Sequence, residues 1–386
     1  MPEPSPAQDP DGVTVVVPTH TGRQYLVDRL LNSLHKAGAA AGVGCQVVVV
    51  DSAPQEQSRQ LRDRCRRDKL DYLRGPQAAG AKRNIGAAAA RYPIVLFIDS
   101  DCRATPELLR RHYEAHRDSP PVVAAIAGPT DMYGEMTPVW RILDGSFEYN
   151  QCYTWPRTYH RLGWATTSNL SVRTEVFHRL GGFRTDTYTP VGGEDVDLGF
   201  RLRAAGYQMH TAPQAVAEHT RENIVRLRQV AHTLFTYGRA DVWLCNQHPQ
   251  QRAPHANVAV IAAVVTALGL TGSLRWRPAA LFGPAFAATI VAVRTARRHR
   301  ATTRGSDPYG RRAYQHVQQR ADAIAVLRTA CMVCVDAMFD VGTMIEAVRR
   351  HQWSNLLSRF HYLDPRDFEP HAATQHAADS GARDGC

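Results

Sequence analysis

The stretch that decides the fold is IVLFIDSDC, residues 94–102, in which five apolar residues lead directly into Asp99 and Asp101. A short apolar run of this kind is typical of a strand buried in a sheet. Two carboxylates so close together repel each other unless a cation lies between them or one of them is protonated. Taken alone, the pair is also compatible with loop acidity or a helix cap, but its oxygens suit a hard divalent ion such as Mg²⁺ or Mn²⁺.

Strands and helices alternate around this stretch. Apolar runs and helical spacing predict buried strands at 13–19, 46–52, 70–75 and 121–130, and helices at 23–37, 55–69, 79–92 and 106–117. The alternation predicts an α/β fold with a Rossmann-like, mostly parallel sheet and helices on both faces. Ligands of such sheets bind at the carboxyl ends of the strands, where Asp51, Asp99 and Asp101 fall.

Aromatic residues crowd the segment 131–165, which we expect to be a long loop with short helices. Aromatic faces pack well on sugar rings and apolar groups, so the segment is a candidate wall for an acceptor molecule. It carries few basic residues, which argues against nucleic-acid binding. The aromatic residues are Tyr133, Trp140, Phe147, Tyr149, Tyr153, Trp155, Tyr159 and Trp164.

The C-terminal part differs in character from the rest. Residues 226–386 carry 20 Lys and Arg against 11 Asp and Glu, whereas residues 1–225 are nearly balanced. Residues 253–274 and 279–293 contain no charged side chain and precede an Arg-rich stretch, and residues 321–348 are predicted to form a third apolar helix. We expect a pair of short helices lying in a bilayer interface, with Arg side chains on lipid phosphates. A helical hairpin inserted from one side and a soluble Ala-rich bundle or homo-oligomer interface are the alternatives.

These patterns divide the chain into four parts. We expect a disordered tail at 1–12, an α/β domain at 13–225, an Arg-rich apolar helical region at 226–369 and a second disordered tail at 370–386. Residues 1–12 show neither the basic start nor the apolar run of a secretory signal. Together with scattered cysteines, this favours the cytoplasm, including the cytoplasmic face of the membrane.

Five blocks of sequence, in order and at matching spacing over roughly residues 13–222, resemble the family-2 glycosyltransferases of the GT-A fold. The blocks are VVVPTHTGRQYLVDRLLNSL, VVVVDSAP, GAKRNIGAAAARYPIVLFIDSDC, TSNLSVRTEVFHRLGGF and GGEDVDLGFRLRAAGY. The resemblance implies a GT-A domain and a nucleotide-sugar donor carrying UDP, GDP or dTDP. It also implies Mn²⁺ or Mg²⁺ as the cofactor.

The resemblance also assigns roles to individual residues. It implies that Asp99 and Asp101 hold the metal and the diphosphate, and that His219 is a third metal ligand. It places Asp51 on the donor base or ribose, although Asp51-Ser52-Ala53-Pro54 departs from the common Asp-Asp-Gly-Ser pattern and leaves the nucleotide open. The further donor-binding residues that it implies are Pro18, Thr19, Lys82, Arg83 and Ser100.

A second acidic pair, Glu194 and Asp195, lies between a Gly pair and a predicted helix at 192–208. The resemblance implies that Asp195 is the general base of an inverting transfer and that Glu194 orients the acceptor. The residues themselves agree, because free N–H groups of a first helical turn stabilise a carboxylate, so we expect Asp195 to be ionised at neutral pH. Helix capping is the alternative role of Asp195, and Asp197 is expected to be structural.

The sequence therefore predicts a metal-dependent, inverting hexosyltransferase that moves a sugar from a nucleotide-diphosphate donor to an acceptor hydroxyl. The acceptor class stays open between a small molecule, a glycan and a lipid-linked molecule. One alternative is a sugar-phosphate nucleotidyltransferase, but the turn THTGRQ fits its Gly-rich, basic loop poorly. A noncatalytic sugar- or lipid-binding relative is the other, and the intact second acidic pair argues against it.

Overall fold

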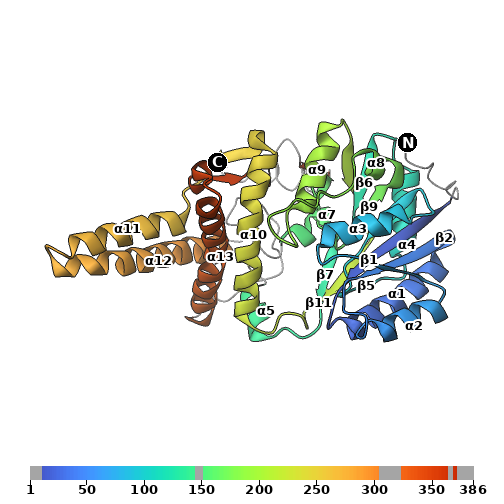
Figure 1. Ribbon diagram of the computed structural model, residues 1–386, viewed down its shortest axis with the longest axis horizontal. Helices are drawn as coiled ribbons and strands as arrows, with labels where there is room; N and C mark the ends of the chain where they lie inside the picture. The colour runs from blue at the N-terminus through green and yellow to red at the C-terminus, as the bar shows by residue number, and fades with distance from the viewer. Residues whose placement is uncertain (1–10, 144–150, 304–322, 364–367, 372–386) are drawn as a thin grey trace. The chain divides into compact units, whose positions relative to one another are not determined.

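The computed structural model describes residues 11–143, 151–303, 323–363 and 368–371 (Figure 1). The chain forms two compact units. The sheet unit contains Met1–Gly134, Cys152–Asn223 and Tyr362–Cys386, and the helical unit contains Glu135–Gln151 and Ile224–His361. The division is thus not a single cut near residue 225. The tails predicted at 1–12 and 370–386 lie almost entirely outside the described residues.

A nine-stranded sheet with the order β14-β8-β10-β6-β9-β4-β1-β2-β3 forms the centre of the sheet unit. Four of its eight strand pairs are parallel and four are antiparallel, so the sheet is mixed rather than mostly parallel as predicted. β9 runs antiparallel to both β4 and β6, and β8 runs antiparallel to β10 and β14. Its strands are β1 Gly12–Thr19, β2 Gly44–Asp51, β3 Asp71–Arg74, β4 Ile94–Phe97, β6 Val123–Ala127, β8 Tyr159–Leu162, β9 Leu170–Arg173, β10 Gln208–Thr211 and β14 Glu369–Pro370.

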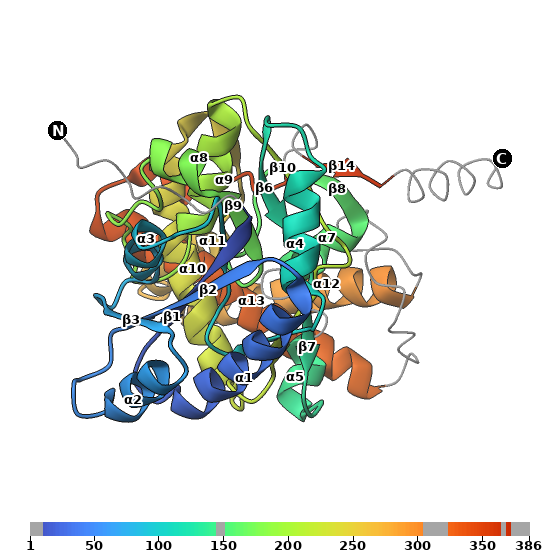
Figure 2. The same ribbon diagram turned by 90° about the vertical axis from the view of Figure 1, so that its right-hand side faces the viewer.

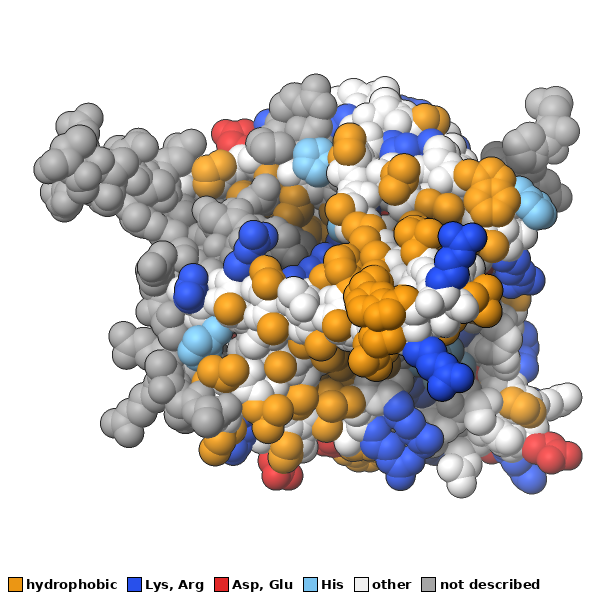
Figure 3. All heavy atoms as spheres, turned by 90° about the vertical axis from the view of Figure 1, so that its left-hand side faces the viewer, with side chains coloured by type: hydrophobic (Ala, Val, Ile, Leu, Met, Phe, Trp, Pro, Cys, Tyr) orange, Lys and Arg blue, Asp and Glu red, His pale blue; other side chains and the backbone are white. Residues whose placement is uncertain are grey.

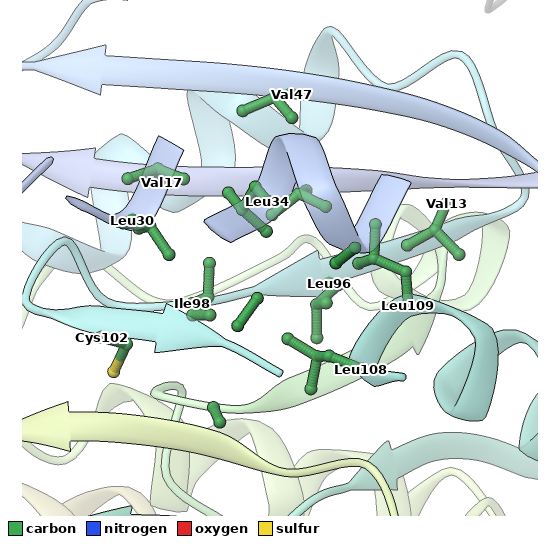
Figure 4. Close-up of a cluster of buried hydrophobic side chains, with 14 of the residues drawn as sticks. Val13, Val17, Leu30, Leu34, Val47, Leu96, Ile98, Cys102, Leu108 and Leu109 are labelled. Carbon is green, nitrogen blue, oxygen red and sulfur yellow. The ribbon is translucent and has the colours of Figure 1, made fainter. Parts of the chain in front are cut away.

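Helices cover both faces of this sheet (Figure 2). One face packs on α1, α2 and α4 through a continuous apolar cluster, in which alternate residues of β1 and β4 meet Leu30, Leu34 and Leu109 (Figure 4). On the other face, Phe97 of β4 contacts Phe177 of α8, and α3 packs on β1 and β2. The helices of this unit are α1 Gln24–Ala41, α2 Arg59–Arg67, α3 Ala79–Ala88, α4 Leu108–Arg117, α7 Trp155–Thr158, α8 Thr174–Arg179 and α9 Glu194–Ala204.

The strand register brings the carboxyl ends of the central strands together. β1 and β2 pair from Gly12 opposite Gly44 to Thr19 opposite Asp51, so they end side by side. A separate three-stranded sheet follows β4 and consists of β5 Cys102–Ala104, β11 Ala217–Thr220 and β7 Thr130–Tyr133, in the order β5-β11-β7. β5 and β7 were not expected from the sequence as separate strands.

The helical unit is built from α5 Pro138–Leu143, α10 Leu227–Gln247, α11 Val258–Gly272, α12 Phe282–Thr303 and α13 Ala323–Arg349, with a small sheet of β12 Arg252–Pro254 and β13 Ser358–Phe360. The three apolar helices predicted near 253–274, 279–293 and 321–348 are present. The sequence did not single out α10, which packs along α13. Its apolar residues alternate with Arg, Gln and His, so its helical period is weak.

A chain of neutral polar groups crosses the core of the sheet unit. Asn169 Nδ2 donates to the carbonyls of Pro129 and Ala215, which leaves its Oδ1 to accept from His112 Nε2 at 2.8 Å. His112 Nδ1 therefore accepts from the Ser171 hydroxyl at 2.8 Å, and that oxygen accepts from His116 Nε2 at 2.9 Å. Because the two rings are completely enclosed, burial lowers the pKa of His112 to about 4 and that of His116 well below its usual value.

We expect the free energy of unfolding to fall as the pH drops from about 6.5 to 4, since histidine in the unfolded chain is protonated across this window and buried His112 is not. The loss for His112 is on the order of 3 kcal/mol at pH 4. Urea titrations at several pH values measure it. Replacing both residues, His112→Gln and His116→Gln, should flatten this dependence, whereas His178→Gln, at an exposed position, should not. Equal slopes for the double variant and the wild type would contradict the assignment.

Candidate active site

The ends of β1 and β2 form one side of the site. Lys82 of α3 reaches across them, and its Nζ donates to the carbonyl of Thr19 at 2.9 Å and to the Ser52 hydroxyl at 3.1 Å. Burial, followed by the neighbouring Arg83, lowers the pKa of the Lys82 ammonium to about 8. The Thr19 hydroxyl is buried and has no hydrogen-bond partner among the described residues. A polar ligand at these strand ends would therefore meet an available hydroxyl and a cation close by.

Asp51 ends β2 and is almost completely buried. Its Oδ1 accepts from the amide of Ala53 at 2.8 Å, and its Oδ2 accepts from the Tyr72 hydroxyl at 3.0 Å and from Arg74 at 3.4 Å. The carboxylate thus fixes the turn that follows β2, and Tyr72 and Arg74 of β3 join the strand-end cluster. Pro18 is buried within β1 and Ser100 in the loop after β4, so both shape the edge from beneath.

Asp101 and His219 lie next to each other on the opposite side of this edge. The antiparallel pairing of β11 with β5 sets His219 opposite Cys102, and the amide of Thr220 donates to the Asp101 carbonyl at 3.1 Å. His219 Nε2 lies 3.3 Å from Asp101 Oδ2. Arg23 and Asn223 donate to the same carboxylate oxygen. His219, which the resemblance implied as a third metal ligand, is far from the Asp-x-Asp motif in sequence but is its neighbour in the structure.

The chemistry of this cluster fits a divalent cation. Burial alone would raise the pKa of the Asp101 carboxyl, but His219 and Arg23 hold it well below its usual range, so Asp101 is ionised. Asp101, Cys102 and His219 place their ligand atoms within 4.8 Å of one another. Burial raises the pKa of the Cys102 thiol well above its usual value, so Cys102 is the weak member of the group. The carboxylate and imidazole that remain are ligands that Mn²⁺ accepts.

Arg83 of α3 joins the two acidic motifs. Its Nη2 donates to Asp99 Oδ1 at 2.7 Å and its Nη1 to Glu194 Oε1 at 2.9 Å. The guanidinium is buried and lies over the Phe183 ring at 5.8 Å from the centroid. The Asp99 side chain is 30% exposed and pairs with Arg83. Asp101 instead contacts Arg23 and His219. Arg83 is therefore a buried residue with two carboxylate partners and not a solvated helix residue.

Two glycines and α9 hold the second acidic pair. Gly192 and Gly193 both have left-handed backbones, with φ of 99° and 91°, which residues with a Cβ rarely adopt. Their turn lets Glu194 Oε2 accept from the amide of Gly192 at 2.8 Å while Asp195 Oδ1 accepts from the amide of Val196 at 2.9 Å. Asp197 is fully buried and pairs with Arg201 and Arg184, as expected for a structural residue.

Asp195 does not remain fully ionised at neutral pH, contrary to our expectation. Burial, and next the Glu194 carboxylate, raise the pKa of the Asp195 carboxyl to about 7, and they outweigh Arg83 and the helix amides that lower it. The side chain keeps some exposure to solvent, so protons and a substrate hydroxyl can reach it. A pKa near the working pH suits a group that takes up a proton and releases it again.

The aromatic segment is only partly a wall. Trp140, Trp155 and Trp164 are buried, and Trp155 packs edge-on against Trp164 and Phe368. These three side chains belong to the cores of their units and do not face an acceptor. Tyr153 lies beside His219, with ring centroids 6.1 Å apart. Phe147 and Tyr149 lie outside the described residues.

The sequence did not identify two residues of the cluster, Arg23 and Asn223. Arg23 follows β1 in THTGRQ, and Asn223 follows β11 in HTREN. Both positions come directly after strand ends, which is the signal that could have found them. Their partner Asp101 lies 78 and 122 positions away in sequence, so their pairing depends on the sheet topology.

The chain is similar to known glycosyltransferases. Residues 14–184 match the family described as glycosyl transferase family 2. The chain is 29% identical over 300 residues to a pre-mycofactocin glycosyltransferase of Mycobacterium tuberculosis, covering 74% of this chain and 57% of that protein. It is 28% identical over 225 residues to a validoxylamine A glucosyltransferase of Streptomyces hygroscopicus subsp. limoneus, covering 51% and 49%. The chain thus spans about half the length of the curated relatives it matches.

Among solved structures, the chain is similar to a mannosyltransferase of Pyrobaculum calidifontis in complex with GDP-Man and Mn²⁺, at 16% identity and a TM-score of 0.49, covering 90% of this chain and 91% of that one. The family match supports the resemblance that the five sequence blocks indicated. Residues 14–184, which match the glycosyl transferase family 2, contain most of the strands of the large α/β sheet.

Proposed function

We propose that this protein transfers a sugar from a nucleotide-diphosphate donor to an acceptor hydroxyl with inversion at the sugar carbon. The observation that carries the proposal is the joining of two acidic motifs by one buried guanidinium, that of Arg83. It keeps the residues predicted for the diphosphate and for the acceptor at one edge of the sheet. A UDP-, GDP- or dTDP-linked hexose is the donor, and the relative named as a glucosyltransferase supports a hexose.

The donor nucleotide lies at the ends of β1 and β2 in this proposal. The Thr19 hydroxyl, which has no partner among the described residues, and the nearby Lys82 ammonium are the groups available to it. Asp51 fixes the turn beneath and offers its carboxylate to the base or ribose. Pro18 and Ser100 shape the floor of this region.

Asp101 and His219 would hold a Mn²⁺ or Mg²⁺ ion, with Asp99 as the third ligand that the resemblance implies. When bound, the ion supplies positive charge that stabilises the departing nucleoside diphosphate. His219 must be neutral to act as a metal ligand. Burial lowers the pKa of its imidazole, but the Asp101 carboxylate raises that pKa by more, so the net shift is upward. Arg23 and His219 therefore hold Asp101 ionised until the cation arrives.

Asp195 is the general base. Its carboxylate takes the proton of the acceptor hydroxyl as that oxygen forms a bond to the sugar C1 and the C1–diphosphate bond breaks. Glu194, held by Arg83 and the Gly192 amide, orients the acceptor. The intact Asp195 speaks against a noncatalytic sugar-binding relative. The family match favours glycosyl transfer over nucleotidyl transfer.

The helical unit brings the enzyme to a membrane in this proposal. The cytoplasm, and the cytoplasmic face of the membrane in particular, is the expected location, and a homo-oligomer remains a prediction. The net positive charge of residues 226–386 supports contact with an anionic surface. Small molecules, glycans and lipid-linked acceptors all remain candidates for the acceptor.

Asp195→Asn should lower the turnover rate by about 10²- to 10⁴-fold and leave donor binding intact, because an amide cannot accept the proton. Nucleotide release from a panel of sugar nucleotides with Mn²⁺ measures turnover, and thermal shift measures donor binding. Asp186→Asn, at an exposed position before the same glycine turn, is the matched control and should behave as wild type. Full turnover by Asp195→Asn would refute the base assignment.

The pH profile of turnover should carry an acidic limb centred near 7. Asp195 has a raised pKa, so the carboxylate that accepts a proton predominates above about 7 and is lost below it. The rate should therefore fall about tenfold per pH unit below the limb. A limb near the ordinary aspartate value of about 4 would show that a different group is the base.

Asp101→Asn and His219→Ala should each weaken Mn²⁺ binding by at least about tenfold, because each removes a ligand atom of one buried cluster. Electron paramagnetic resonance of free Mn²⁺ measures binding without donor or turnover. Glu218→Gln is the control, since Glu218 precedes His219 on β11 but its side chain pairs with Arg103 of the neighbouring strand β5. Unchanged Mn²⁺ affinity in both ligand variants would place the metal elsewhere.

Arg83→Gln should lower the free energy of unfolding by about 3–5 kcal/mol, since it leaves the buried Glu194 and the partly buried Asp99 without their cation. Arg179→Gln breaks an exposed pair with Glu175 and should cost less than about 1 kcal/mol. Urea titration compares the two. A loss for Arg83→Gln no larger than that for Arg179→Gln would remove the bridging role.

A further inference from the structure

The helices α11 and α12 form a hairpin, residues 258–293, within the helical unit (Figure 1). Many of its large apolar side chains are exposed. Gly269 is the only residue of α11 that is buried. Arg277–Arg300 has the length and composition of a helix that crosses a membrane, and few of its residues are buried. The apolar residues of the hairpin that expose half or more of their surface are Val264, Leu268, Leu270, Leu274, Trp276, Leu281 and Phe282.

Apolar residues occupy all sides of these helices. Leu268 and Leu270 of α11 are two positions apart, about 200° around the helix, and both are exposed. A helix that lies flat in a bilayer interface has one polar face, whereas one that is apolar all round is enclosed by protein or by lipid. The flat pair of helices that we expected from the sequence is therefore not what the structure favours. A second copy of the chain would cover only one side of the hairpin and would leave apolar residues on its other side exposed.

The polar groups of the hairpin are satisfied internally. The hydroxyls of Thr266, Thr271 and Thr289 donate to backbone carbonyls of their own helices, at 2.7, 3.1 and 2.8 Å. Small residues let the helices touch, since a Cβ on Gly269 or on Gly283 would collide with the facing helix or its connection. Internal satisfaction of polar groups and small residues at the contact are what a hydrocarbon environment requires.

Charge lies at both ends of the hairpin and is of one sign. Arg275 and Arg277 flank Trp276 at the turn, and Arg294 and Arg297 follow the apolar part of α12. The sequence contains no Asp or Glu between Asp241 and Asp307. Figure 3 shows Arg side chains among hydrophobic ones on this face, with few acidic groups. Arg and Trp at the two ends of an apolar segment match the headgroup regions of a bilayer with anionic lipid.

The base of the hairpin is anchored on α13. Asp340 accepts from the amide of Val258 at 3.1 Å and lies 3.1 Å from His255, and Asn257, which caps α11, donates to the Asp340 carbonyl at 3.0 Å. Arg298 of α12 pairs with Asp336 at 2.5 Å. The hairpin is thus held as a preformed element at its base.

We propose, on the basis of the membrane association suggested above, that this hairpin inserts into a bilayer containing anionic lipid, with its base at one interface and the turn Arg275–Arg277 at the other. The 15 residues of α11, Val258–Gly272, span about 22 Å as a helix, which is shorter than the roughly 30 Å of the hydrocarbon core. Local thinning of the bilayer and the long Arg side chains make up the difference.

Flotation of the full chain with vesicles containing about 30% anionic lipid tests the proposal. The wild type should float and remain bound in about 1 M salt, where surface attraction is screened. Leu268→Asp should lower the bound fraction about a hundredfold, since it places a charge at the bilayer centre. Leu357→Asp is the matched control, because Leu268 and Leu357 are each 66% exposed, and it should float as the wild type does.

Depth is measured with brominated lipids. The variant carries Leu268→Trp together with Trp276→Phe, which adds a fluorescent side chain in the middle of the hairpin. Bromine near the acyl-chain ends should quench this added fluorescence more strongly than bromine near the headgroups. Stronger quenching by the shallow bromine would overturn insertion in favour of a flat hairpin. Release by high salt, or a soluble oligomer that ignores vesicles, would overturn it as well.

The same samples separate this proposal from the proposed activity. Leu268→Asp should keep the circular dichroism of the wild type and its thermal shift with sugar nucleotide. Equal vesicle binding by a folded Leu268→Asp protein refutes the insertion and leaves the transferase proposal standing. If the wild type binds vesicles but shows no response to sugar nucleotides, the transferase proposal is refuted and the insertion stands.

Discussion

One buried cation fixes the geometry on which the site depends. The Arg83 guanidinium is 5% exposed and has carboxylates on two sides, Asp99 after β4 and Glu194 at the start of α9. Removing an arginine from water is costly, so its site must supply opposite charge at hydrogen-bond distance. α3, the loop after β4 and the N-terminus of α9 are thereby held together. The neighbouring Asp195 takes its elevated pKa from the same crowded, acidic surroundings.

A second constraint is the pairing of β5 with β11. It brings His219 into contact with Asp101 and ties the chain segment after β11, including Asn223, to the same carboxylate. Arg83 pairs with Asp99, whereas the pairing of β5 with β11 brings His219 to Asp101. The division allows Asp99 to face the second motif while Asp101 stays ionised beside Arg23 and His219.

The two units differ in how completely they cover their apolar residues. The sheet unit buries its apolar residues against its own helices, and even its enclosed histidines form a neutral hydrogen-bonded chain with Ser171 and Asn169. In the helical unit, α10 and α13 pack closely on each other, whereas α11 and α12 leave Leu268, Leu274 and Leu281 uncovered. The proposed insertion into a bilayer would cover these side chains, since helices that are apolar on every side are enclosed by protein or by lipid.

The sequence by itself determined the α/β class, the Asp-x-Asp motif at the end of β4, the second acidic pair and the three apolar helices. Those features are local: a β-branched run, a Gly turn or an uncharged stretch fixes its own structure through backbone sterics and burial. Only the tertiary structure decided that β9 is antiparallel, that Trp155 and Trp164 pack in a core, and that Arg23 and Asn223 meet Asp101. It also decided that burial and the Glu194 carboxylate raise the pKa of Asp195, and that α11 and α12 form a hairpin with exposed apolar side chains. Each of these depends on which distant segments become neighbours, and therefore on the desolvation and charge that one residue imposes on another.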